Sequence, residues 1–291
     1  MSSNSDQEYL NYKDMPDIYN SGSGGQRYGW RIRHGKKQFH HGIDFGVSGK
    51  VGVPIGVPEQ FNGWYVYVFE NNHVDSMGNE VFLVSPDSKK VAKFSHVANG
   101  SFEHIKNGMQ VFTGDWIGDV GGTGLSEDKD DYALHIHFEY GNNPSAATIE
   151  SVITPEGEEI ETNYQTILFE NENPTKILTE KQLTDATRLA VTSKQRILSG
   201  ETLEESRKNH NRDKDNESFS EWFKSSFIGR VLGLSQNTTP TSENHVLPIN
   251  EFMKNGSKIH LRLTDTLNKN AYSITRENIS ITTTSTYQNA K

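Results

Sequence analysis

The sequence predicts a mainly β protein with an antiparallel sheet, followed by a C-terminal extension of mixed α/β character. Between Tyr28 and Tyr164, short runs of β-branched and aromatic residues alternate with Gly, Asn, Asp and Pro. After Pro174 the apolar residues recur at three- and four-residue spacing, which is the period of an amphipathic helix. We therefore expect three regions: a polar N-terminal arm (1–25), a β domain (26–165) and a helical and extended C-terminal region (166–291).

Individual elements follow from the same patterns. Strands are expected where an apolar run is bounded by turn-forming residues, most clearly at 64–69, 80–84, 91–94 and 134–140. Thr179 and Gln182 fit a capping box that opens a helix over 179–199, closed by Gly200. The rest of the C-terminal region is expected to hold a charged helix surface or loop (204–218), a short helix (219–234), a linker (235–244) and strands or an extended tail (246–291).

Composition excludes several classes of function. The 291 residues include 29 Lys and Arg against 38 Asp and Glu, whereas a protein that binds nucleic acid through phosphates usually has the opposite balance. The chain has no cysteine, which excludes disulfide scaffolds, thiol enzymes and Cys-ligated metal sites. No run approaches the roughly 18 apolar residues of a membrane-spanning helix. A metal site here would have to use carboxylates and some of the 11 histidines.

Two histidine clusters stand out. His135 and His137 are two apart, so in a strand both side chains point to the same face. His40 and Asp44 flank a Gly and a β-branched Ile, which favours convergence through a bend between loop and strand over a helix. Two imidazoles and one carboxylate, with a fourth position open to water, are the composition of a catalytic zinc site.

Other histidines and glycines receive a simpler interpretation. A lone histidine is usually solvated or hydrogen-bonded, so no functional role is assigned to the isolated ones, which are His34, His73, His104, His210, His245 and His260. The GGTG sequence at 121–124 is not followed by a helix pattern or by the residues of a phosphate-binding loop. We expect it to form a tight turn beside the histidines.

Four ordered blocks, at 28–46, 78–97, 107–124 and 134–140, resemble the catalytic domain of the lysostaphin-type (LytM-like) zinc endopeptidases. Members of this family cut the peptide cross-links of bacterial peptidoglycan. The resemblance implies an antiparallel peptidase domain in which His40, Asp44 and His137 bind one zinc ion. It also implies that His96 and His135 are unligated catalytic histidines, with the choice of general base left open. His41 takes a variable position beside the ligand and is not expected to bind metal.

The chain also departs from the family pattern. An acidic insertion, Glu127 to Asp131, precedes the second histidine cluster and is expected to line the substrate groove. Residues 165–291 match no family element. The bond that is cut is therefore open, with a direct cross-link of the D-Ala–diaminopimelate type favoured over pentaglycine.

Two other functions compete with a zinc endopeptidase. A mononuclear iron oxygenase also uses two histidines and a carboxylate, but its short spacing is H-x-D, and His40 and Asp44 are four apart. The alternative from another class is a non-catalytic peptidoglycan-binding or regulatory module of the same fold. The presence of all five family site residues argues against that alternative.

The context of action is expected to be the bacterial cell wall. The N-terminal residues show neither the basic start nor the apolar stretch of a secretory signal peptide. We therefore expect delivery within a phage particle, with tail or baseplate proteins as partners, or export by an injection machine. The C-terminal region would then be a docking module. Neither nucleic-acid binding nor membrane insertion is expected.

Overall fold

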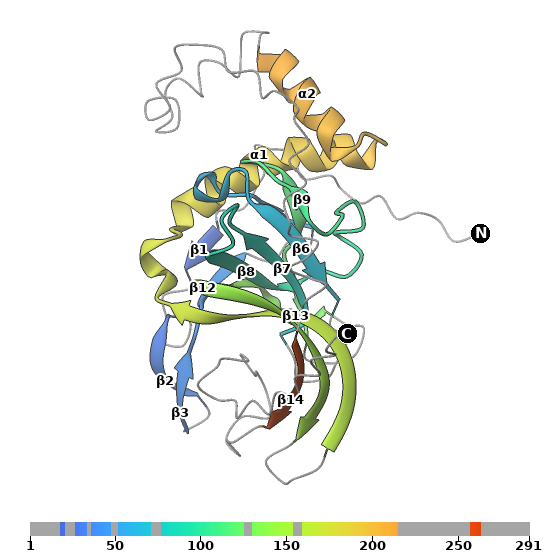
Figure 1. Ribbon diagram of the computed structural model, residues 1–291. Helices are drawn as coiled ribbons and strands as arrows, with labels where there is room; N and C mark the ends of the chain where they lie inside the picture. Colours follow the sequence, from blue (N-terminus) through green and yellow to red (C-terminus); the bar gives the residue numbers. More distant parts are fainter. Residues whose placement is uncertain are drawn as a thin grey trace, which may run out of the picture.

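The computed structural model (Figure 1) describes residues 18–20, 27–33, 36–47, 52–70, 77–124, 130–153, 159–214 and 257–262. The first part of the chain forms strands β1 (Ile18–Asn20), β2 (Gly29–Arg33), β3 (Lys36–His40), β4 (Ile43–Val47), β5 (Pro54–Gly56), β6 (Tyr65–Phe69), β7 (Asn79–Val84) and β8 (Lys90–Val97). The middle part adds β9 (Met109–Gln110), β10 (Trp116–Asp119), β11 (Gly121–Thr123), β12 (Asp130–Ile153) and β13 (Glu159–Glu172). The remaining elements are helices α1 (Glu180–Leu198) and α2 (Leu203–Lys214), strand β14 (Ser257–Arg262) and the 3₁₀ turns η2 (Glu59–Phe61) and η3 (Pro174–Lys176).

The main sheet has the order β1-β4-β12-β8-β7-β6-β9, and all of its neighbouring strands are antiparallel. Strand β12 is its longest member and also pairs with β11 and β13, and in parallel with β14. In Figure 1, β12 and β13 run together as a long curved ribbon. The prediction of a mainly antiparallel β fold is confirmed, although β12 extends well beyond the expected 134–140.

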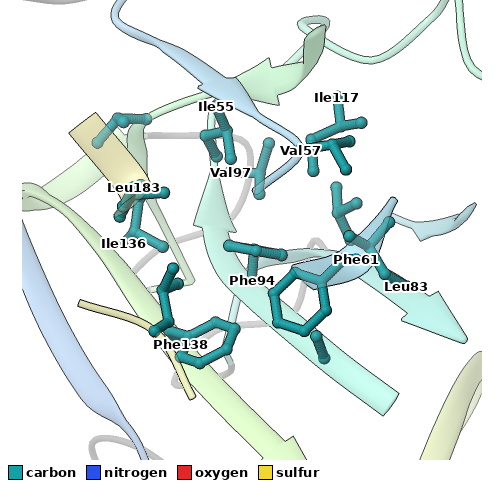
Figure 2. Close-up of a cluster of buried hydrophobic side chains, with 14 of the residues drawn as sticks. Ile55, Val57, Phe61, Leu83, Phe94, Val97, Ile117, Ile136, Phe138 and Leu183 are labelled. Atoms are coloured by element: carbon teal, nitrogen blue, oxygen red, sulfur yellow. The ribbon is translucent and has the colours of Figure 1, made fainter. Parts of the chain in front are cut away.

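One face of the main sheet carries the apolar core. Ile136 and Phe138 of β12, Phe94 of β8 and Leu83 of β7 are fully buried on this face. Figure 2 shows these residues in one cluster with Leu183 of α1, which lies beside Ile136, and with Ile55 of β5 and Ile117 of β10. The alternation that was expected along β12 therefore places its aliphatic and aromatic residues in the core, opposite the histidines.

Helix α1 covers this apolar face and confirms the helix expected at 179–199. Thr179 caps it in a full capping box with Gln182. At Gly56 of β5 a side chain would overlap the backbone of Ala186, so only glycine permits the observed approach of helix to strand. Lys194 of α1 adds an ion pair of 2.6 Å to Asp119 at the end of β10.

Part of the C-terminal region packs on the β domain. Strand β13 belongs to the sheet and crosses the boundary expected at residue 165. Its Ile167 and Phe169 join Tyr67 and Phe82 in a second apolar cluster. The charged stretch at 204–218 is helical as far as Lys214, as part of α2. The short helix expected at 219–234 and the linker at 235–244 lie outside the described residues. The domain limits at 25 and 165 stay predictions.

Candidate metal and histidine site

The site lies on the opposite face of the main sheet, where three strands bring distant residues together. His40 is the last residue of β3, Asp44 is the second residue of β4, and His137 lies in the middle of β12. Strand pairing places His137 directly across from Asp44. Gly42 forms the bend between β3 and β4, and a Cβ there would come within 2.6 Å of the His137 ring. The bend expected from the sequence is therefore present, and it requires glycine.

These three side chains converge on one point. The Nδ1 atom of His137 lies 2.9 Å from Oδ1 of Asp44 and 3.1 Å from Nε2 of His40. The Nε2 atom of His40 lies 3.3 Å from the same carboxylate oxygen. One ligand atom from each residue can be chosen so that all lie within 4.8 Å of one another. His40 and His137 are buried, and Asp44 is partly exposed.

The outer nitrogen of each imidazole is held by a protein acceptor. Nδ1 of His40 donates to the carbonyl oxygen of Arg27 at 3.0 Å. Nε2 of His137 lies 3.0 Å from Oε1 of Glu139. Hydrogen bonds of this kind fix the tautomer and the orientation of metal-binding histidines. His40 is thus left with Nε2, and His137 with Nδ1, to face the common point.

The charges of the site suit a cation. Burial would raise the pKa of Asp44, but hydrogen bonds from His137 and His40 hold it well below its usual value. Burial would lower the pKa of His137, but its bonds to Asp44 and Glu139 raise that pKa to about 9. Burial lowers the pKa of His40, which stays neutral. A bound metal would displace the proton of His137. The ionised carboxylate and two imidazoles then form a hard and borderline donor set that matches zinc, and no thiolate competes with them.

His96 and His135 form a pair beside this point. Their ring centroids are 4.6 Å apart, and the ring of His96 is 6.1 Å from that of His137. His96 is buried, and its Nδ1 donates to the carbonyl oxygen of Thr123 at 2.7 Å. Nδ1 of His135 donates to the carbonyl oxygen of Ala133 at 2.6 Å. Burial and the neighbouring His135 and His137 lower the pKa of His96 well below 6.5, so this ring is neutral at pH 7.

A local irregularity directs His96 toward the site. The pairing of β7 with β8 shifts register between Asn79 and Val81, and His96 takes a left-handed backbone conformation with φ of 63°. Bulges of this kind redirect side chains and are common beside active sites. The carbonyl that accepts from His96 is that of Thr123, the last residue of β11. The tight turn expected at 121–124 is therefore wrong, because residues 121–123 form a strand. This segment is a short strand because Gly121 and Gly122 let it approach the backbones of β8 and β12 closely.

All five residues singled out from the sequence therefore lie together. His41 is buried against the Phe39 ring, at 4.8 Å between centroids, and is not among the three converging ligand residues. Within the acidic insertion, residues 127–129 lie outside the described part of the chain. The placement of the insertion relative to a substrate groove stays a prediction.

Four neighbouring residues were missed by the sequence reasoning. Glu139 continues the alternation of His135 and His137, and Tyr132 packs its ring 4.9 Å from that of His96. Arg31 places a guanidinium nitrogen 3.9 Å from Asp44. Lys93 is buried beside Glu139. For Glu139 and Lys93 a signal existed, because each is a charged residue inside a run that otherwise predicts a buried strand.

Among known proteins, the similarities of this chain are to solved structures. No protein-family description and no curated protein matches the chain. Among solved structures, the chain is similar to LytU, with 18% identity over 63% of this chain and 97% of that one, and a TM-score of 0.36. It is also similar to the catalytic domain of the antimicrobial peptidase lysostaphin from Staphylococcus simulans, with 27% identity over 42% and 79% of the two chains and a TM-score of 0.30.

A third similar structure is a candidate glycyl-glycine endopeptidase, LytM, from Ruminococcus gnavus. Identity is 17% over 61% of this chain and 55% of that one, and the TM-score is 0.31. Lysostaphin and LytM are also the names of the family that the sequence motifs resemble. All three TM-scores are below 0.5, and the roles of individual residues therefore depend on this chain's own geometry.

Proposed function

We propose that the protein is a zinc-dependent endopeptidase of the lysostaphin type that hydrolyses peptide cross-links of bacterial peptidoglycan. One observation carries the proposal. His40, Asp44 and His137 offer ligand atoms within 4.8 Å of one another, and the paired rings of His96 and His135 lie next to them. This combination of three ligands and two further imidazoles supplies the parts of a metal-assisted hydrolysis.

The metal would be held by Nε2 of His40, Nδ1 of His137 and the Asp44 carboxylate, with one zinc ion in the site. When bound, zinc supplies a Lewis acid that polarises a carbonyl oxygen and makes water acidic enough to react near neutral pH. The protein also contributes the Arg27 carbonyl, which accepts a hydrogen bond from Nδ1 of His40 and fixes that imidazole, and the close bend at Gly42.

His96 and His135 would move the protons. Because Nδ1 of His96 donates to Thr123 and burial keeps the ring neutral, its Nε2 is the basic atom, so we assign His96 as general base. His135 is partly exposed, so a bound substrate could reach it, which suits proton donation to the oxyanion or the leaving amine. The chain would thus use a histidine where other zinc proteases use a glutamate.

A non-catalytic module of the same fold would not need this arrangement. A binding module has no use for a buried neutral imidazole beside a metal-binding triad. The iron oxygenase alternative has no support beyond the identity of the three ligands. Both alternatives make a different prediction, namely no metal-dependent cleavage of cell walls.

The test is hydrolysis of purified peptidoglycan, followed as the release of free amino groups. The zinc-loaded protein should cleave, a chelator should abolish cleavage, and added zinc should restore it. His104→Ala is a matched control because His104 stacks on Trp116 away from the site. Zinc binding without any cleavage of several wall types would support the binding module instead.

The bond that is cut calls for a separate measurement. We propose a direct cross-link of the D-Ala–diaminopimelate type, whereas one similar structure is described as a candidate glycyl-glycine endopeptidase. Mass spectrometry of muropeptides released from walls with direct and with glycine cross-bridges distinguishes the two. New N-terminal glycine on the products would contradict our proposal for the bond and leave the zinc endopeptidase intact.

Delivery to the wall is proposed to occur in a phage particle or through an injection machine. None of the described helices is long and apolar enough to cross a membrane. Proteomics of purified particles and of injected fractions tests this proposal. Recovery of the protein only as a free, processed enzyme in culture supernatant would contradict it.

A further inference from the structure

Behind the metal ligands lies a buried cluster of charges to which the proposed mechanism assigns no step. We propose that Glu139 is a positioning residue that orients His137 for zinc, and that Lys93 and Glu80 hold Glu139 in place. This inference rests on the proposed metal site. It adds a determinant of metal affinity that lies outside the ligand set.

The placement follows from strand alternation. His137 and Glu139 are two residues apart on β12, so both side chains lie on the face of the sheet that is opposite the apolar core. Glu80 and Lys93 occupy the same face of β7 and β8. Glu139, Glu80 and Lys93 are 1%, 4% and 6% exposed, so none of these charges is solvated by bulk water. Charges buried to this degree persist only when they are paired.

The contacts fix both oxygens of Glu139. Its Oε1 atom lies 3.0 Å from Nε2 of His137 and 3.4 Å from Nζ of Lys93. Its Oε2 atom accepts from the Asn171 amide of β13 at 3.1 Å. The carboxylate therefore cannot turn away from His137 without breaking a second bond.

Lys93 is fixed in turn by the next strand. Its Nζ atom lies 2.7 Å from Oε1 of Glu80. The other oxygen of Glu80 accepts from the Thr166 hydroxyl of β13 at 3.4 Å. Strand β13 thus closes the cluster through both Asn171 and Thr166. The result is a continuous line of contacts from β13 and β7, through Lys93 and Glu139, to a metal ligand.

The two histidine ligands are held differently. The outer nitrogen of His40 donates to a neutral backbone carbonyl, whereas that of His137 donates to a carboxylate. A carboxylate partner makes the imidazole a stronger donor to a metal, and loss of such a partner typically weakens metal binding about 10–100-fold. In addition, Glu139 and Glu80 share a single ammonium, so the cluster has an excess negative charge that a cation bound by His137 balances.

The experiment measures zinc affinity by competition with a chromogenic chelator, in the full-length protein. Glu139→Gln is the main variant, because it is nearly isosteric and leaves Lys93 paired with Glu80. The matched control is Glu172→Gln, which removes a half-exposed carboxylate of β13 that pairs with Lys90 of β8 at 3.3 Å. Glu80→Gln tests the far end of the cluster.

We expect zinc affinity to fall about 10–100-fold in Glu139→Gln. A smaller fall is expected in Glu80→Gln and no change in Glu172→Gln. Imidazole ¹H–¹⁵N spectra of the zinc form should also lose the strongly deshielded Nε2 proton of His137 in Glu139→Gln. A purely structural role for Glu139 would lower thermal stability without moving this resonance.

Two results would overturn the inference. One is wild-type zinc affinity in a folded Glu139→Gln protein. The other is an unchanged His137 resonance in that variant. If the wild-type protein itself binds no zinc, the proposed function fails and this inference fails with it. The wild-type measurement thus distinguishes the two failures.

Discussion

The two faces of strand β12 are built from adjacent residues but follow different rules. Ile136 and Phe138 enter the apolar core, where neighbouring strands and α1 contact them with side chains of similar kind. His135, His137 and Glu139 point to the other face. There His137 contacts Asp44 of β4, Glu139 contacts Lys93 of β8, and His137 and Glu139 contact each other.

The difference concerns how each face tolerates change. An apolar core accepts other side chains of similar volume at a moderate cost, because dispersion and burial are not directional. A buried polar site requires particular partners at particular distances, because an unpaired polar group or charge in the interior is costly. Variants on the apolar face should therefore change stability, whereas variants on the polar face should change metal binding and chemistry.

The largest effect is expected from the metal ligands. His137→Ala and Asp44→Ala should each reduce bound zinc from one per chain to near zero and abolish hydrolysis, because two remaining ligands cannot hold a catalytic ion. Elemental analysis of the purified variants and peptidoglycan hydrolysis check this. A full zinc complement in either variant would contradict the ligand assignment.

Loss of a proton-transfer group should leave the metal in place. His135→Ala should keep one zinc and lower turnover by about 10²–10⁴-fold, the usual contribution of a general acid or base. His96→Ala should behave similarly, although it also leaves the Thr123 carbonyl without its side-chain donor. Zinc analysis and steady-state rates on cross-linked muropeptides are the measurements. Wild-type rates in both variants would contradict the mechanism.

Phe138→Ala changes the residue next to His137 on the opposite face. It should lower the free energy of unfolding by about 3–5 kcal/mol, because it leaves a cavity at a fully buried position. The folded fraction should still bind one zinc. Urea unfolding, combined with zinc analysis of the folded protein, checks this. If Phe138→Ala had normal stability but had lost zinc, the assignment of stability to the apolar face and of metal binding to the polar face would be contradicted.

Acid should weaken the polar face through Glu139. Burial would raise the pKa of Glu139, but Lys93 and His137 hold it well below 4.5. Below about pH 4.5 the unfolded chain takes up a proton that the folded chain does not, so stability falls by up to about 1.4 kcal/mol per pH unit for this group. Urea unfolding of the chelator-treated protein should show a flatter acid dependence in Glu139→Gln. An identical slope would contradict this account.

The smallest effect concerns the helix that covers the apolar face. Thr179→Ala removes the capping side chain of α1 and should cost about 1 kcal/mol of stability. Zinc content and turnover should stay unchanged, because α1 does not reach the site. Thermal unfolding and hydrolysis rates check this. A fall in activity with normal stability would show coupling between the two faces.

The sequence by itself determined the local features. Alternation in LHIHFEY separated the histidines from Ile136 and Phe138, because side chains in a strand alternate whatever surrounds it. The capping residues of α1 were readable for the same reason, since Thr179 and Gln182 bond to each other within the first turn. The absence of cysteine left only histidine and carboxylate ligands. The family motifs added which histidines belong together.

Only the tertiary structure decided how these features meet. The contact of His40 with His137 joins residues 97 positions apart, and it depends on the register of β4 against β12. A shift of one residue would turn every side chain to the other face, and no local pattern fixes that register. The bulge at His96 and the choice of Lys93 as the partner of Glu139 likewise depend on pairing between strands. Each segment by itself determines only the face to which its side chains point. Hydrogen bonding between strands that are distant in the sequence determines which of these side chains meet in the site.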